Sequence, residues 1–189
     1  MKRLLILILV LSLTVCSAMA ETVAEQILTD VTGSVSLVLP DGYRLITPEM
    51  KDILFSQESI DAAIEEGVHP DVASLIDPEI MAGAMVVDGS GLLYLFCQPV
   101  AGATNRILPL VKDTLDDTMS SGYESMGYSV LGSDLVTVGD LYWYVMTLSV
   151  ADISSTLCMT YTNGYTVSIS FTGIPEEDIL TILPTLQIL

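Results

Sequence analysis

The stretch STLCMTYTNGYTVSISFT, residues 155–172, decides the fold class of this chain. Its second half, from Tyr165 onward, alternates strictly between apolar residues and Ser or Thr, which is the pattern of a strand with one buried face. Its first half alternates in a similar way, and Asn163-Gly164 between the halves is a strong hairpin signal. The stretch therefore predicts two antiparallel strands joined by a tight turn.

The length of this turn sets which residues of the two strands face each other. A two-residue Asn163-Gly164 loop would place Tyr161 opposite Thr166 and so pair apolar with polar side chains. A three-residue loop that begins at Thr162 would place Tyr161 opposite Tyr165 and keep the apolar residues on one face. We therefore expect the three-residue loop, with Gly164 at positive φ.

Three further turn signals predict three more hairpins, and thus about eight strands in all. Pro40-Asp41-Gly42 would join residues 34–39 to 43–47, residues 88–91 would join 83–87 to 92–98, and Gly139-Asp140 would join 128–138 to 141–151. Gly42 should also have positive φ, because it would close a three-residue loop.

About three helical regions separate these strands. Residues 48–67 predict one or two helices, with Ser56 as the cap of the second. Residues 104–121 have apolar residues at helical spacing and end before Gly122, and Pro175 would begin a last helix with Leu180 and Leu183 packed inward. Runs of antiparallel strands interrupted by helices predict an α+β domain with helices layered on a sheet.

Two segments of the chain carry a resemblance to a known family. SVSLVLPDGY, residues 34–43, resembles the opening hairpin of PsbP-like domains. YTVSISFTG, residues 165–173, is similar to their last strand, and an acidic helix and residues 186–189 follow it. The resemblance implies an α/β/α sandwich, export from the cell and an accessory role. It supplies no catalytic motif that transfers to residues of this chain.

The first twenty residues have the pattern of a secretory signal peptide. Lys2 and Arg3 precede an apolar run over residues 4–15, and Ala18-Met19-Ala20 forms a small-residue cleavage site before Glu21. We therefore divide the chain into a signal peptide (1–20), a polar lead-in (21–33) and a single α+β domain (34–189). Cys16 also fits part of a bacterial lipoprotein signal, so a lipid tether would require modification of Cys16.

The charge of the chain limits its partners. The chain has six Lys and Arg residues and 24 Asp and Glu residues, which give a net charge of −18. Removal of Lys2 and Arg3 with the leader changes the net charge to −20. Such a field repels nucleic acid and anionic lipid surfaces, and it attracts a cation or a basic protein or peptide. No later segment is long and apolar enough to predict a membrane span. We expect a secreted or envelope-located protein.

The sequence offers few residues for catalysis. Its one histidine, His69, precedes Pro70 in an expected loop, and no phosphate-binding, dinucleotide-binding or calcium-loop motif occurs. We expect no cofactor and no catalytic residue, and hence an exported non-enzymatic binding or accessory domain. An extracellular hydrolase that uses only carboxylates is the alternative, and two close, buried carboxylates would favour it.

Three groups of side chains are candidates for a site. The carboxylates of Asp113, Asp116 and Asp117 lie within about one helical turn and form a weak candidate for cation binding. Cys97 and Cys158 remain after removal of the leader, and the sequence allows either a disulfide between them or two separate thiols. The run 142–144 (Tyr-Trp-Tyr) could stack against a ligand, but its alternation favours core packing.

The leader generates the first testable prediction. Export of the full chain from a bacterial host should yield protein that begins at Glu21, because signal peptidase cuts after small residues at the last and third-last positions of the leader. Intact-mass measurement of the exported protein decides the matter. A lipid-modified protein that begins at Cys16 would contradict the prediction.

Overall fold

The computed structural model describes residues 26–65, 79–150 and 153–189. The strands in these residues are β1 (Gln26–Thr29), β2 (Val35–Leu39), β3 (Tyr43–Leu45), β4 (Ala82–Val86), β5 (Leu92–Pro99), β6 (Ser129–Val138), β7 (Leu141–Val150), β8 (Ile153–Thr162), β9 (Tyr165–Thr172) and β10 (Gln187–Ile188). The helices are α2 (Pro48–Leu54), α3 (Gln57–Glu65), η1 (Asn105–Ile107), α5 (Leu108–Ser125), α6 (Glu176–Ile182) and η2 (Leu183–Thr185). None of the helices in this part of the chain is long and apolar enough to cross a membrane.

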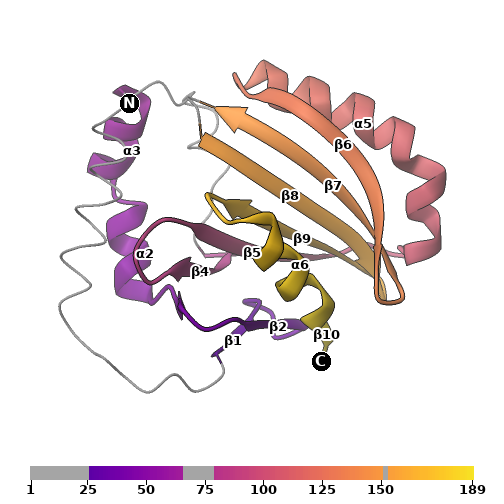
Figure 1. Cartoon of the computed structure of the whole chain (residues 1–189), viewed down its shortest axis with the longest axis horizontal. Coiled ribbons are helices and arrows are strands. Elements are labelled where there is room, and N and C mark those ends of the chain that lie inside the picture. The colour runs from indigo at the N-terminus through magenta and orange to yellow at the C-terminus, as the bar shows by residue number, and fades with distance from the viewer. Residues whose placement is uncertain (1–25, 66–78, 151–152) are drawn as a thin grey trace.

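The strands form two antiparallel sheets. The larger sheet has seven strands in the order β3-β4-β5-β9-β8-β7-β6, and the smaller has three in the order β1-β2-β10. Figure 1 shows the small sheet and α6 on one side of the large sheet, while α5 runs along β6 and β7. This arrangement confirms the predicted α+β class.

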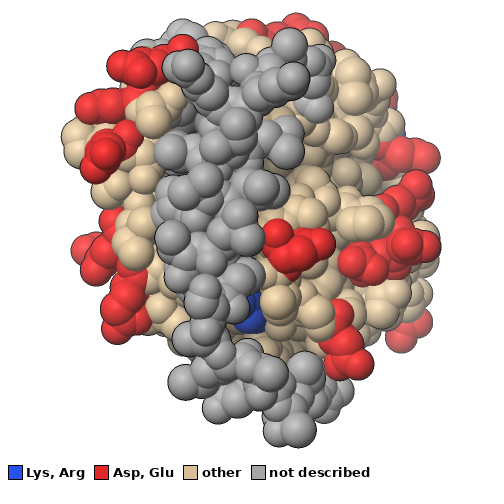
Figure 2. Space-filling model, turned by 60° about the vertical axis from the view of Figure 1, so that its left-hand side comes forward, with Lys and Arg blue, Asp and Glu red and all other residues tan. Residues whose placement is uncertain are grey.

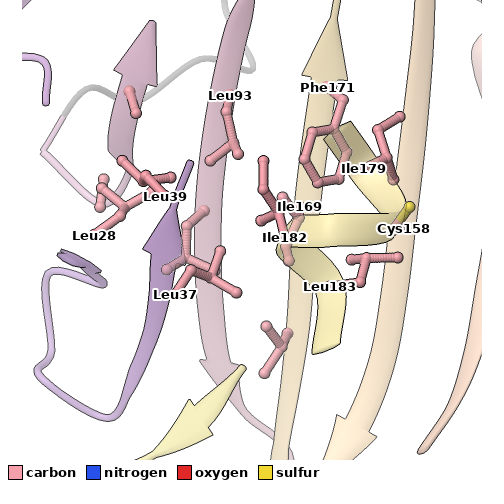
Figure 3. Packing of buried hydrophobic residues seen from close by; sticks show 14 of the residues in the cluster. Leu28, Leu37, Leu39, Leu93, Cys158, Ile169, Phe171, Ile179, Ile182 and Leu183 are labelled. Atoms are coloured by element: carbon pink, nitrogen blue, oxygen red, sulfur yellow. The ribbon is translucent and has the colours of Figure 1, made fainter. Parts of the chain in front are cut away.

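The main core lies between the small sheet with α6 and the large sheet. Side chains from β1, β2 and α6 point toward side chains of β5 and β9 (Figure 3). The fully or nearly fully buried members include Leu37, Leu93, Ile169, Phe171 and Ile182. Successive side chains of a strand point to opposite faces of the sheet, so the alternate residues of these strands lie on the other face, against a second layer.

The second layer covers that opposite face from its two ends. Leu108 at the start of α5 packs in a second cluster with Tyr144 and Met146 of β7. At the other end, the ring of Phe55, which follows α2, lies 6.1 Å from the ring of Tyr94 on β5, centroid to centroid. The large sheet is therefore covered on both faces, as in the expected sandwich.

The prediction of one sheet with four hairpins is wrong at its first hairpin. Gly42 has the expected positive φ of 90°. However, β2 pairs with β1 and β10, whereas β3 pairs with β4, so the two strands beside Pro40-Asp41-Gly42 belong to different sheets. The turn residues fix only the local bend. The partner of β2 comes from the segment expected to be a polar lead-in, which contains β1.

The other three hairpins are confirmed, but the register of the last one is not as predicted. Gly164 has positive φ (82°), and so does Asn163 (48°), which is the conformation of a two-residue type I′ turn. Thr162 therefore pairs with Tyr165, and Tyr161 with Thr166. The prediction failed because it assumed one buried face, whereas β8 is buried on both, with Cys158 in the main core and Met159 in the second cluster.

The helices also differ from their predicted faces and ends. The Ser56 hydroxyl accepts a hydrogen bond from the Ser59 N–H at 3.2 Å, so the expected cap of α3 is present. α5 continues past Gly122 and ends before Gly127, which has a φ of 85°. Leu180, expected to pack inward, is 54% exposed, and Leu110, one of the apolar residues at helical spacing in 104–121, is 83% exposed. Other residues of each helix take the buried positions.

A buried carboxylate closes the loop between β1 and β2. Asp30 is 4% exposed, and its carboxylate accepts hydrogen bonds from the N–H groups of Thr32, Ser34 and Val35 at 2.7–2.9 Å and from the Thr32 hydroxyl at 2.5 Å. Burial alone would raise the pKa of Asp30, but these hydrogen bonds outweigh it and hold the pKa below its ordinary value of 3.8.

This loop generates a testable prediction. Asp30→Asn should lower the free energy of unfolding at pH 7 by about 1–3 kcal/mol, because an amide offers one acceptor oxygen where the carboxylate offers two. The folded-state pKa is depressed, so this stabilisation is present above the ordinary aspartate pKa and is lost as the pH falls through the lower folded-state value. Denaturant unfolding of both proteins across that range measures the effect.

Asp41→Asn is the matched control, because it removes one carboxylate from an exposed turn of the same region. The free energy of unfolding of this control should stay within about 0.5 kcal/mol of the parent at neutral pH. Equal stability of the Asp30 variant and the parent at pH 7 would show that the carboxylate is not what closes the loop.

Candidate functional site

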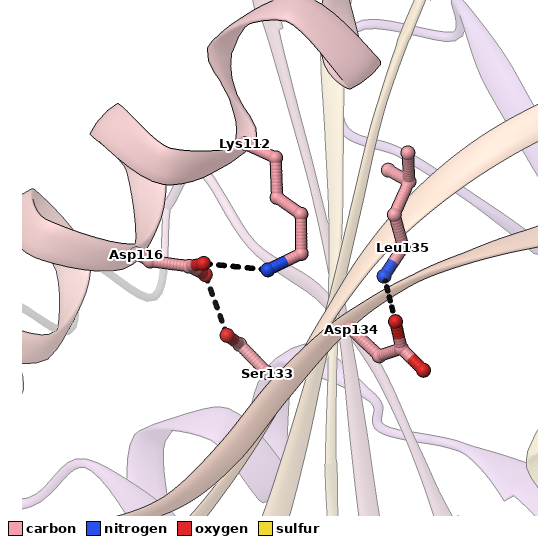
Figure 4. Close-up of polar contacts among 5 residues, drawn as sticks. All are labelled: Lys112, Asp116, Ser133, Asp134 and Leu135. Atoms are coloured by element: carbon pink, nitrogen blue, oxygen red, sulfur yellow. Dashed lines mark hydrogen bonds and ion pairs between the residues drawn. The ribbon is translucent and has the colours of Figure 1, made fainter.

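A polar cluster on the described surface lies where α5 meets β6. The Lys112 ammonium contacts one oxygen of the Asp116 carboxylate at 2.5 Å, and the Ser133 hydroxyl donates to the other oxygen at 2.5 Å (Figure 4). The i,i+4 spacing of Lys112 and Asp116 puts both on one side of the helix. Asp116 thereby ties α5 to the outer strand of the sheet.

The electrostatics of this cluster favour an ionised carboxylate. Burial alone would raise the pKa of Asp116, but the hydrogen bonds from Lys112 and Ser133 outweigh it and lower the pKa. The hydrogen bond to Asp116, together with the charges of Asp116, Asp113 and Asp134, raises the pKa of Lys112. Burial, reinforced by the neighbouring Asp116, raises the pKa of Tyr144 to about 12. Asp116 and Lys112 are therefore charged at neutral pH, and Tyr144 is neutral.

We call Lys112, Asp113, Asp116 and Asp134 the α5–β6 cluster. It holds three carboxylates and one ammonium, so it is negative at neutral pH. Sequence reasoning selected Asp113 and Asp116 but missed Lys112, Ser133 and Asp134. The i,i+4 spacing could have revealed Lys112, whereas Ser133 and Asp134 reach the helix only through the fold.

The three aspartates predicted as a weak cation site do not act together in the structure. Within the described ranges, no group of three or more His, Cys, Asp or Glu side chains is placed to hold a metal ion. Asp116 is bonded to Lys112 and Ser133. On the helix, Asp117 lies one residue beyond Asp116 and so points about 100° away from it.

The two cysteines are free thiols on the same face of the large sheet. Cys97 is 7% exposed and aligns with Val167, while Cys158 has no exposed surface and aligns with Ile169 on the opposite side of β9. Two strand spacings place their Cα atoms about 9 Å or more apart, beyond the roughly 7 Å that a disulfide allows. Of the two alternatives that the sequence left open, the structure has separate thiols.

Burial also makes these thiols poor nucleophiles. It raises the pKa of Cys158 to about 12, and burial together with the charge of Asp30 raises the pKa of Cys97 to about 11. A thiol reacts as its thiolate, so both side chains are unreactive at neutral pH in the folded protein.

The Tyr-Trp-Tyr run belongs mainly to the core. Trp143 and Tyr144 have no exposed surface, and only Tyr142 is exposed, at 39%. The backbone N–H and C=O of Tyr142 are hydrogen-bonded to the Asn105 side chain at 2.7 and 2.8 Å, which fixes η1 against β7. His69, Cys16 and the predicted cleavage site before Glu21 lie outside the described residues.

Comparison with solved structures places the chain among known folds. No protein-family model matches the sequence, and no curated protein matches it. The solution structure of cyanobacterial PsbP (CyanoP) from Synechocystis sp. PCC 6803 is similar with a TM-score of 0.52, over 92% of this chain and 98% of that chain, at 11% sequence identity. The chain has a PsbP-like fold.

Two further solved structures are similar at lower scores. One is a protein of Bacteroides thetaiotaomicron VPI-5482, 14% identical, with a TM-score of 0.46 over 83% of this chain and 46% of that chain. The other is the Ran-binding protein Mog1p of Saccharomyces cerevisiae, 8% identical, with a TM-score of 0.47 over 88% of this chain and 96% of that chain. The comparison with cyanobacterial PsbP alone confirms the PsbP-like expectation for the fold, and none of the three structures assigns a site residue.

The buried thiols generate a testable prediction. In the exported protein, neither Cys97 nor Cys158 should react with a chromogenic disulfide reagent at pH 8, because both are buried and protonated. In denaturant both should react. A Ser129→Cys variant, whose new thiol is exposed, is the positive control and should react in the folded state. A second fast-reacting thiol in that control would refute the assignment.

Proposed function

We propose that the chain is an exported, non-enzymatic binding or accessory domain whose partner is a basic protein or peptide. The observation that carries the proposal is the large excess of carboxylates over cations, a net charge of −18 over the whole chain. Figure 2 shows far more acidic than basic surface on the face it presents. A surface of this kind raises the local concentration of cationic partners and speeds their association.

The surroundings of the acidic residues support binding rather than hydrolysis. The carboxylate-only hydrolase would need two close carboxylates, one with a raised pKa. In the described ranges the buried acidic residue is Asp30, and its pKa is lowered by four donated hydrogen bonds. The pKa of Asp116 is lowered as well. Both groups are therefore suited to remain charged and not to donate a proton.

The export part of the proposal rests on the leader pattern over residues 1–20. The accessory role is supported by the PsbP-like fold only as an analogy, since one fold hosts many functions.

Copurification of the exported protein tests the binding role. The protein should be recovered from its native envelope or medium with a partner in stoichiometric amount, and that partner should be basic. Raising the salt from about 0.1 M to about 1 M should release it, because the Debye length then falls from about 10 Å to about 3 Å. An acidic partner that remains bound at high salt would contradict the proposal, and so would partner-free protein that hydrolyses envelope material.

A further inference from the structure

We propose that the outer edge of β6 binds an extended basic segment of the partner as an additional antiparallel or parallel strand of the large sheet. This inference rests on the proposed function and gives it a site. β6 (Ser129–Val138) ends the seven-stranded sheet, and in the described part of the chain it pairs with β7 alone. Figure 1 shows it as the outermost strand, with α5 alongside.

The turn between β6 and β7 determines which backbone groups face outward. Val138 pairs with Leu141 across the two-residue loop Gly139-Asp140, and such a flanking pair exchanges hydrogen bonds. Antiparallel pairs then alternate, so the N–H and C=O groups of Ser133, Leu135 and Thr137 point away from β7. These groups form a row that an extended peptide can pair with.

A side-chain contact confirms this direction independently. The Leu135 N–H donates to Oδ1 of Asp134, the preceding residue, at 2.7 Å (Figure 4). An N–H bonded to β7 would not be free for that contact. The carboxylate thus occupies an edge donor that a partner strand would take, and an exposed side chain is readily displaced.

The other edges of the two sheets offer less. β3, at the opposite end of the large sheet, has three residues, and its Leu45 N–H already donates to the Gln26 side chain at 3.1 Å. β1 has four residues and β10 has two. β6 has ten residues, with a register irregularity between Val130 and Gly132 that leaves a regular edge from Gly132 to Val138.

The charges around this edge select a basic partner. Asp134 alternates with Ser133 and Leu135 and so lies on the opposite face of the strand from α5. Asp116 lies on the α5 side of the edge, where it is paired with Lys112, and the charge of Asp113 acts on Lys112 from the same helix. A second copy of this chain would bring the same carboxylates together, which is unfavourable. Lys or Arg side chains of an added strand would lie beside carboxylates on both faces.

The test uses two synthetic decapeptides, one alternating Lys with Val and one alternating Glu with Val, titrated into the isotope-labelled exported protein and followed by NMR. The Lys peptide should shift the amide signals of Ser133, Leu135 and Thr137 and slow the hydrogen exchange of these amides. The Glu peptide should not bind, because the carboxylates around the edge repel it.

Five variants, two of which are controls, test the assignment of the site to β6. Thr137→Pro removes an outward N–H that the fold does not use, so the sheet should survive and the affinity for the Lys peptide should fall about fivefold to tenfold. Thr137→Val keeps that N–H and should bind like the parent. Asp113→Asn and Asp134→Asn should each weaken binding by about twofold to fivefold, while Glu176→Gln, on the distant α6, should have no effect.

The peptide and variant experiments distinguish a wrong β6 site from a wrong function. Equal affinity of the Thr137→Pro and Thr137→Val variants, shifts confined to another surface, or equal binding of the Glu peptide would overturn the β6 assignment. The proposed function would survive if the exported protein still retained a basic, salt-released partner. If the Lys peptide does not bind at millimolar concentration, the β6 assignment is wrong. If, in addition, no basic partner copurifies, both proposals are wrong.

Discussion

Trp143 and Tyr144 are neighbours on β7, they point to opposite faces of the sheet, and neither has any exposed surface. The rest of the structure depends on this two-sided burial, because each apolar face of a sheet must be covered by a further layer. β1, β2 and α6 cover the Trp143 face. α5 covers the Tyr144 face at one end, and the α2 region, through Phe55 and Tyr94, covers it at the other.

This layering decides where the polar and reactive groups lie. Cys97 and Cys158 lie on the main-core face of the sheet. β9 separates them, and burial keeps both thiols protonated. Asp30 is buried too, but it satisfies the N–H groups of its own loop and so stabilises the start of β2. These interior groups therefore stabilise the fold, and Asp30 is the one buried charged residue in the described ranges.

An antiparallel sheet that does not close into a barrel keeps two edges, and the two edges here differ. β3 is short, and one of its outer N–H groups is occupied by Gln26. β6 is long. Two features disfavour its pairing with the strand of another chain: the register irregularity after Val130 and the Asp134 side chain, which accepts a hydrogen bond from the Leu135 N–H. The Asp134 carboxylate repels an acidic strand but not a basic one, so it disfavours pairing with an acidic chain more strongly. In the proposed binding mode, the same carboxylates would repel a second acidic copy and complement a cationic strand.

The sequence by itself determined the local elements. Turn chemistry and the period-two alternation identified the β4–β5, β6–β7 and β8–β9 hairpins, the cap at Ser56 and the positive φ of Gly42 and Gly164, because these features depend on a few adjacent residues. For the candidate site, helical spacing could place Lys112, Asp113 and Asp116 on one helix.

Only the tertiary structure decided which strands pair beyond a hairpin and in which register. β2 and β3 separate because distant segments, β1 and β10, take both edges of β2. The β8–β9 register follows the turn and not the apolar pattern, because burial on both faces of β8 removes the information in that pattern. The contact of Asp116 with Ser133, and the exposure of Leu110 and Leu180, likewise depend on which face of a helix meets the sheet. Such contacts join residues far apart in the chain, so their energies are absent from any local stretch of sequence.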